Sequence, residues 1–477
     1  MKVIYYILSA LLLNTIVSCG KLVDIDKPRT ELPQSSVFLN DNTAIAAMVG
    51  VYSGMNTGNY QFANVLTTFM AAMSADEFAY AAVLADFSEF RENALLPGNT
   101  RVNNIWEQAY QLNYSANAII EGLTASTTLS PAVKTQLLGD ARFVRAFCHF
   151  YLVNMFGDVP LILDADVRKN TNLPRTAKEQ VYTAIIADLK EAKELLSNDY
   201  PGNKERIRPN KAVATALLSR VYLYIENYAM AEQEAGEVIN NSNYKLLKDE
   251  PAKNGMKDVF LMNSPEALWQ LQSVNTGGGR NTWEGNLFVP TAAPLYRLTK
   301  EAAGLENAFE SGDKRFKNWV GSYTTTTTPG LTHRYPFKYK VRTGTPVTEY
   351  SMVIRFAELY LIRAEARIMQ NKLEPGIQDL NVLRDRAGLA GLATPASQEE
   401  GMRKVEQERR VELFAEWGHR WFDLKRWKSI SGDAGKTRAD DVLGPIKPAW
   451  KSTAILFPIP TNALRTNLNL VQNKGYN

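Results

Sequence analysis

The chain has 477 residues, and its 54 lysine and arginine side chains outnumber its 50 aspartate and glutamate side chains by four. A protein whose main partner is nucleic acid needs a concentrated basic field, so this small excess argues against nucleic acid as a partner. The length is sufficient for one large domain or for two to three ordinary ones, with a substantial hydrophobic core.

The first segment is a short apolar run that ends at a cysteine. Lys2 gives a positive start, residues 3–17 are mostly apolar, and Ser18 is a small residue directly before Cys19. This order is typical of a secretory signal, and the run is shorter than the roughly 20 apolar residues that a bilayer-spanning helix needs. We therefore predict a signal peptide over residues 1–18.

The expected cleavage point, Ile16 to Cys19, resembles a bacterial lipobox, in which the leader is cut before the cysteine and the thiol receives lipid. Since two or more acyl chains anchor a protein stably, we predict lipidation at Cys19 and a lipidated tether over residues 19–40. The alternative is an ordinary cleaved signal that contains a cysteine. With Cys19 lipidated, Cys148 has no partner for an intrachain disulfide, so stability must come from packing.

The pattern over residues 41–262 is helical. The last two of its amphipathic segments have tetratricopeptide spacing, in which Ser219, Tyr222 and Ala231 take the small, aromatic and small positions. Hairpins of this kind stack into a solenoid whose surface usually binds a partner. The amphipathic segments span residues 41–54, 62–79, 101–122, 131–156, 177–197, 209–225 and 228–240.

The composition changes over residues 263–350, where three glycines from Gly277 and five threonines from Thr324 interrupt the chain and the aromatic residues have no helical period. We predict a loop-rich insert with short strands here. Residues 351–477 return to helices and close with an irregular tail, packed as one domain with the scaffold. The expected fold class is mostly α, with tetratricopeptide-like helical hairpins and a loop-rich irregular subdomain.

Six stretches, in order along the chain, resemble motifs of the SusD/RagB family, the nutrient-binding outer-membrane lipoproteins of Bacteroidetes. One is similar to the family's Glu-Ala-Arg-Phe-Leu-Arg-Ala helix that runs into Phe-Gly-Asp-Val-Pro, and the last is similar to its Phe-Pro-Ile-Pro and Gln-Asn-x-Gly-Tyr ending. The six stretches are Trp106–Glu121, Gly139–Leu161, Arg208–Tyr224, Ile354–Ala366, Val405–Trp427 and Leu456–Tyr476.

The resemblance implies a helical scaffold that is lipid-anchored at the outer membrane, faces the cell surface, binds a glycan and covers a SusC-like TonB-dependent transporter. Some members of the family bind peptides, so a peptide ligand is the nearest alternative. A glycoside hydrolase is an alternative from a different class.

Charged residues recur among large apolar residues on two of the expected helices. This spacing favours partly buried ion pairs that fix helix packing over a catalytic cluster. The residues are Arg142 and Arg145 on one helix, and Glu408, Arg409, Glu412 and Arg420 around another.

A sugar site combines exposed aromatic rings, which pack on apolar C–H faces, with polar side chains that bind the hydroxyl edge. The resemblance places such a site on loops between the early helices and on the insert. We expect Trp283, beside a glycine run, to be the leading contact, whereas Tyr80 and Phe87 also fit a core. The candidates are Asp76, Glu77, Tyr80, Phe87, Arg91 and Asn93 within residues 74–99, and Arg280, Asn281 and Trp283 within residues 275–290, with Trp319, Tyr323 and Tyr335 as lesser ones.

The sequence predicts neither catalysis nor a cofactor. His149, His333 and His419 lack the spacing of metal ligands, and we predict no metal site. The adjacent carboxylates of Asp76 and Glu77 cannot straddle a glycosidic bond. Cys148 is most simply a small core residue.

Overall fold

The computed structural model describes residues 34–250, 255–274, 277–326 and 330–476. The predicted signal peptide, Cys19 and most of the predicted tether lie outside these residues. Within the described part of the chain, no helix combines the length and the apolar character that crossing a bilayer requires.

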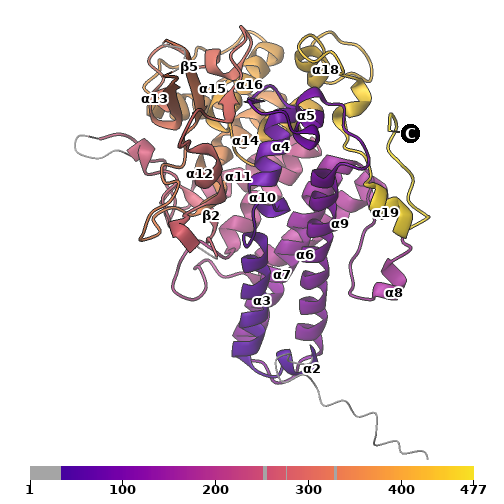
Figure 1. The fold of residues 1–477 in the computed structure, drawn as a ribbon. Coiled ribbons are helices and arrows are strands. Elements are labelled where there is room, and N and C mark those ends of the chain that lie inside the picture. The colour runs from indigo at the N-terminus through magenta and orange to yellow at the C-terminus, as the bar shows by residue number, and fades with distance from the viewer. Residues whose placement is uncertain (1–33, 251–254, 275–276, 327–329, 477) are drawn as a thin grey trace, which may run out of the picture.

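A stack of long helices forms the scaffold, in which helices that follow one another in the chain pack side by side (Figure 1). Several begin with a side-chain cap; the Asn210 side chain, for example, accepts the Val213 amide and caps the following helix. The mostly helical class is therefore confirmed. The long helices are α3 (Asp41–Met55), α6 (Thr100–Ala125), α7 (Pro131–Phe156), α9 (Lys178–Leu195), α10 (Lys211–Tyr224), α11 (Tyr228–Ile239), α14 (Phe356–Met369), α15 (Leu373–Ala387) and α16 (Gln398–Glu412).

Shorter elements connect and cover this stack. The helix pairs α10–α11 and α14–α15 pack as hairpins, which is consistent with the tetratricopeptide spacing of the sequence. The short helices are α2 (Gln34–Val37), α4 (Thr67–Ser74), α5 (Ala85–Glu92), α8 (Val167–Asn170), α12 (Trp283–Phe288), α13 (Lys314–Trp319), α17 (His419–Arg426), α18 (Arg438–Leu443) and α19 (Thr461–Thr466). The strands are β1 (Phe78–Tyr80), β2 (Ala267–Leu271), β3 (Tyr296–Leu298), β4 (Val320–Thr324), β5 (Thr332–Pro336) and β6 (Ser351–Arg355).

The single helix predicted over residues 62–79 is wrong. The chain forms a π-helical turn over Phe62–Leu66, then α4, and ends in strand β1. Asn64 leaves the helical region, with φ −142° and ψ −137°. Its side chain donates to the Gly58 carbonyl at 2.8 Å and accepts the Gln61 amide at 2.9 Å. These local bonds compete with the helical ladder and interrupt it.

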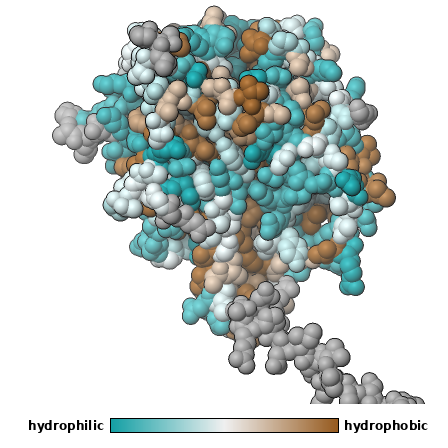
Figure 2. Space-filling model, viewed as in Figure 1, coloured by the Kyte–Doolittle hydropathy of each residue, from teal (hydrophilic) through white to brown (hydrophobic). Residues whose placement is uncertain are grey.

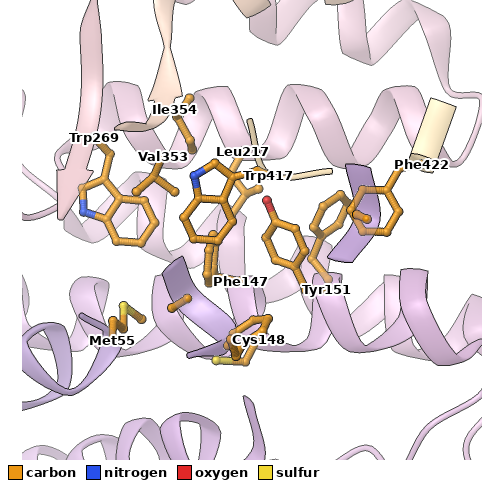
Figure 3. Packing of buried hydrophobic residues seen from close by; sticks show 14 of the residues in the cluster. Met55, Phe147, Cys148, Tyr151, Leu217, Trp269, Val353, Ile354, Trp417 and Phe422 are labelled. Carbon is orange, nitrogen blue, oxygen red and sulfur yellow. The ribbon is translucent and has the colours of Figure 1, made fainter. Parts of the chain in front are cut away.

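The insert leaves and rejoins the scaffold as paired strands. β2 and β6 run antiparallel and are buried along their whole length. Trp269 of β2 packs against Phe147 of α7 with ring centroids 5.2 Å apart, and Trp417 packs against the same ring at 5.4 Å. Figure 3 shows these rings together with Cys148, which is fully buried, so its prediction as a core residue is confirmed.

A buried carboxylate also ties the insert to the scaffold. Glu412, at the end of α16, accepts from Arg355 at 2.6 Å, from Arg315 at 3.1 Å and from Arg386. All four side chains are essentially inaccessible. Burial alone would raise the pKa of Glu412, but the three guanidinium groups hold it well below its ordinary value. Glu412 is therefore ionised at neutral pH.

The predicted ion pairs are confirmed at the other charged residues as well. Arg145 binds Asp188 of α9 at 2.6 Å, and Arg409 binds Asp423 at 2.6 Å. The remaining pairs are Arg142 with Asp188 at 3.2 Å, Glu408 with Arg315 at 2.5 Å, and Arg420 with Asp76 at 2.8 Å.

Glu412→Gln is expected to lower the free energy of unfolding by about 3–5 kcal/mol, because it leaves buried guanidinium charges without their shared partner. Glu399→Gln is the matched control, since Glu399 pairs with Arg403 on the exposed face of the same helix, and it should cost less than about 1 kcal/mol. Urea unfolding of both variants measures the difference. Equal losses would contradict the role assigned to Glu412.

Candidate ligand-binding face

A two-stranded sheet joins the early helices to the insert. β1 pairs antiparallel with β3, so Tyr80 lies opposite Tyr296. Phe288, at the end of α12, packs against Phe78 of β1 with ring centroids 5.7 Å apart. The fold therefore brings together the two stretches in which the sequence analysis places the ligand site.

Three tyrosines pack together under this face. Tyr80 and Tyr296 are buried, at 9% and 4% exposed, so the alternative prediction of Tyr80 as a core residue is confirmed, and Tyr60 is partly exposed. The hydroxyl groups of Tyr60 and Tyr296 lie 2.6 Å apart, and the ring of Tyr80 lies 5.2 Å from that of Tyr296. The Arg101 guanidinium lies 4.7 Å from the Tyr60 ring centre and binds Asp86 at 2.8 Å. Burial raises the pKa of all three tyrosines, so the phenols stay protonated at neutral pH, and the Tyr60 and Tyr296 hydroxyls share one hydrogen bond.

Exposed apolar side chains border the tyrosines. Val83 is 89% exposed, Leu84 is 44% exposed and Leu295 is 46% exposed. The Ala81 amide donates to the Leu295 carbonyl at 2.8 Å, which holds the two edges of this border side by side. Figure 2 shows a hydrophobic group beside α5 on this side of the molecule. Apolar surface next to protonated phenols is typical of a binding surface for an amphipathic ligand.

Arg280 and Trp283 form a stacked pair at the start of α12. The guanidinium carbon of Arg280 lies 3.6 Å from the centre of the indole, and Arg280 donates to the Val274 carbonyl at 2.8 Å. Thr282 caps α12 by accepting the Gly285 amide at 2.9 Å, which fixes where Trp283 projects. Both side chains are partly exposed. The guanidinium therefore covers one side of the indole.

Asp76 and Glu77 are buried, which corrects their prediction as ligand contacts. Asp76 is 3% exposed and binds Arg420 and Arg410, each at 2.8 Å. Burial opposes ionisation of Asp76, but these arginines lower its pKa to about 2. Glu77 is 2% exposed, and burial followed by the nearby charge of Asp76 raises its pKa to about 8. Neither carboxyl group reaches the surface.

Phe87, Asn93 and Asn281 are also structural. Phe87 is 1% exposed, so the alternative prediction that it is a core residue is confirmed. Asn93 takes a left-handed conformation at the end of α5 and donates to the Ser74 carbonyl at 3.0 Å. Asn281 is fully buried, and its carbonyl oxygen accepts the Thr348 amide at 2.6 Å. Their polar atoms serve the chain itself and are not available to a ligand.

The other candidates differ in how far they are exposed. Arg91 is partly exposed, and its ion-pair partner among the described residues is its neighbour Glu92, at 2.8 Å, so it stays a candidate. Trp319 is fully buried and donates to the Met256 carbonyl at 2.9 Å, which removes it. Tyr323 and Tyr335 lie on the β4–β5 hairpin and are partly exposed.

The sequence reasoning missed Tyr60, Tyr296 and Arg101. Tyr60 and Tyr296 meet across 236 residues of chain, and β1 and β3, which bring Tyr296 to the early helices, are each three residues long. So short an antiparallel pairing leaves no periodic signal. In the described part of the chain, no group of three or more His, Cys, Asp or Glu side chains is placed to hold a metal ion.

Two family models match successive parts of the chain. The model described as the SusD family matches residues 296–476, and the model described as starch-binding associating with outer membrane matches residues 24–223. The chain belongs to the SusD family. The resemblance found in the six sequence stretches is thus confirmed.

Relatives and solved structures agree with this assignment. The protein is 27% identical to the SusD-like protein P2 of Formosa agariphila over 99% of each chain, and 25% identical to a SusD-like protein of Bacteroides ovatus over 72% of this chain and 68% of that one. A SusD superfamily structure from Bacteroides vulgatus has a TM-score of 0.76 at 20% identity, covering 92% of this chain and 100% of that one. A laminarin binding SusD-like protein has a TM-score of 0.74 at 24% identity, with the same coverage.

Glu77→Gln is expected to remove part of the pH dependence of stability. Between pH 4.5 and 8 the unfolded chain loses the Glu77 proton while the folded chain keeps it, so stability falls as pH rises through this window, by up to about 1.4 kcal/mol per pH unit. The variant should gain stability over the wild type from pH 5 to pH 7.5 in urea unfolding. Glu92→Gln, at an exposed position, is the control, and an equal trend in both variants would contradict the burial of Glu77.

Proposed function

We propose that this SusD-family protein is a lipid-anchored protein of the outer-membrane surface that binds a neutral oligosaccharide or polysaccharide and delivers it, without chemistry, to a SusC-like TonB-dependent transporter. The observation that carries the proposal is the partly exposed, stacked Arg280–Trp283 pair at the start of α12, the helix whose last residue, Phe288, packs on Phe78 of β1. The name of the laminarin binding relative supports a glycan as the ligand.

The chemistry of this face suits a sugar. The Arg280–Trp283 pair offers a flat surface, and Val83 and Leu84 offer apolar surface for C–H faces. The hydroxyl of Tyr60, a partly exposed residue, can exchange hydrogen bonds with sugar hydroxyl groups. Trp283 and Phe288 are five residues apart in α12, about 7.5 Å along the helix axis, and Phe288 packs on Tyr296 with ring centroids 5.4 Å apart.

A peptide ligand is the nearest alternative. A peptide site would use backbone hydrogen bonds and a charged groove. On this face Arg101 is already paired with Asp86, and Asp76 is buried in its own ion pairs. Both observations favour a neutral ligand. The burial of Asp76 and Glu77 also leaves a glycosidase without its acid and nucleophile at this face.

Trp283→Ala is expected to weaken glycan binding at least tenfold, because it removes the ring on which Arg280 is stacked. The measurement is titration calorimetry of the protein from residue 20 onward with laminarin and soluble starch, followed by chromatography to check that the glycan is not shortened. Tyr114→Ala is the control, since Tyr114 is an aromatic residue of α6 that is 44% exposed and lies outside this face. Full affinity of Trp283→Ala, or shortening of the glycan, would contradict the proposal.

Cys19→Ala is expected to release the protein from the membrane, because the anchoring thiol is lost while the folded domain is unchanged. Fractionation of cells that produce the full chain, with mass spectrometry of the mature amino terminus, measures this. Cys148→Ala is the matched control and should keep the acylated, membrane-bound form. A mature wild-type terminus without acyl chains would contradict the anchor.

A further inference from the structure

A hollow of about 320 Å³ lies on different elements from the candidate face. Its walls come from the turn between α10 and α11, from α14 and α16, and from the loop that follows α17. No residue of β1, β3, α5 or α12 lines it. Its volume is at the lower end of the range for sites that bind small molecules.

Aromatic rings in fixed orientations form the walls of this hollow. The Trp427 indole nitrogen donates to Glu365 at 2.7 Å. The Arg426 guanidinium lies 5.0 Å from the ring centres of both Trp427 and Tyr224. Arg426 is itself held by Glu365 at 2.5 Å and by Asp423 at 2.8 Å. The rings are therefore positioned before any ligand arrives, which lowers the entropic cost of binding.

Polar groups at this hollow have no partner within the described ranges. Neither the Tyr224 nor the Tyr228 hydroxyl makes a hydrogen bond to another described residue, and neither Glu226 nor Lys428 makes an ion pair there. Burial raises the pKa of both tyrosines, so both phenols are protonated donors. Donors and an acceptor thus surround an aromatic wall that the Met402 side chain completes.

The charges around the hollow balance. Four carboxylates and four basic groups line it, so it presents no net charge to a ligand. An anionic or cationic ligand would gain little from such a balance. A small, uncharged ring with one apolar face and a hydroxylated edge matches the aromatic wall and the unpartnered polar groups together.

We infer that this hollow is a second carbohydrate site, which takes one or two pyranose units of a neutral oligosaccharide. The ring packs on Trp427 and Tyr224, and its hydroxyl groups bind Glu226, Lys428 and Tyr228. The ligand class is that of the proposed function, on which this inference rests, but the residues are separate, so one site can fail while the other remains.

The test is titration calorimetry of the protein from residue 20 onward with maltotriose, laminaritriose, cellotriose and xylotriose. Wild type is expected to bind one of these at two sites per molecule. Met402→Trp, which fills the hollow, and Trp283→Ala should each leave one site, and the double variant none. Met262→Trp is the matched control, because Met262 is 43% exposed and lies outside the hollow, and it should keep both sites.

Each outcome separates the two sites. A single site that Met402→Trp abolishes and Trp283→Ala leaves intact supports the second site and removes the candidate face. A single site that Trp283→Ala abolishes and Met402→Trp leaves intact overturns the second site and keeps the proposed function. Binding to polysaccharide but to none of the trisaccharides has the same meaning. Tyr228→Ala repeats the test with a smaller side chain at a partly exposed position, so a folding defect of Met402→Trp cannot decide the result.

Discussion

The buried carboxylate of Glu412 is the interaction on which the arrangement of this protein depends. Its three arginine partners come from three parts of the chain: Arg315 from the insert, Arg355 from the end of β6, and Arg386 from α15. Since a buried charge is tolerated only when it is paired, these segments must reach their places together. The position of the loop-rich insert is therefore set by charge pairing as well as by apolar packing.

The candidate ligand-binding face exists only when the insert is in that position. The scaffold side supplies Tyr60 and Tyr80, and the insert supplies Tyr296 and Trp283. The hydrogen bond between Tyr60 and Tyr296 connects the scaffold side to the insert. Binding residues on loops that a rigid scaffold holds are a common solution, because loops tolerate change while the scaffold keeps the geometry. Here the ion pairs of Glu412 provide that rigidity for the insert.

The helical stack could be predicted because its apolar period is long and regular, and the ion pairs because charged residues recurred among buried apolar ones. The site could be predicted only to its two regions. Asp76 and Asn281 have the polar chemistry of sugar contacts, but that chemistry equally serves arginines and backbone amides inside the fold. Only the partners distinguish these uses. Arg101 and Tyr296 were missed because contacts between distant parts of the chain leave no trace in local spacing.

The same arrangement of a guanidinium, an aromatic ring and carboxylates occurs at the candidate face and at the hollow beside α14. In each, a guanidinium lies over an aromatic ring and is neutralised by carboxylates: Arg101 over Tyr60 with Asp86, and Arg426 over Trp427 with its two acidic partners. The stacking fixes the orientation of the ring, and the carboxylate neutralises the positive charge of the stacked guanidinium. What remains is a rigid, nearly uncharged aromatic surface. Such a surface gains from an apolar ring face and little from a charged peptide, so a neutral sugar suits both places for one physical reason.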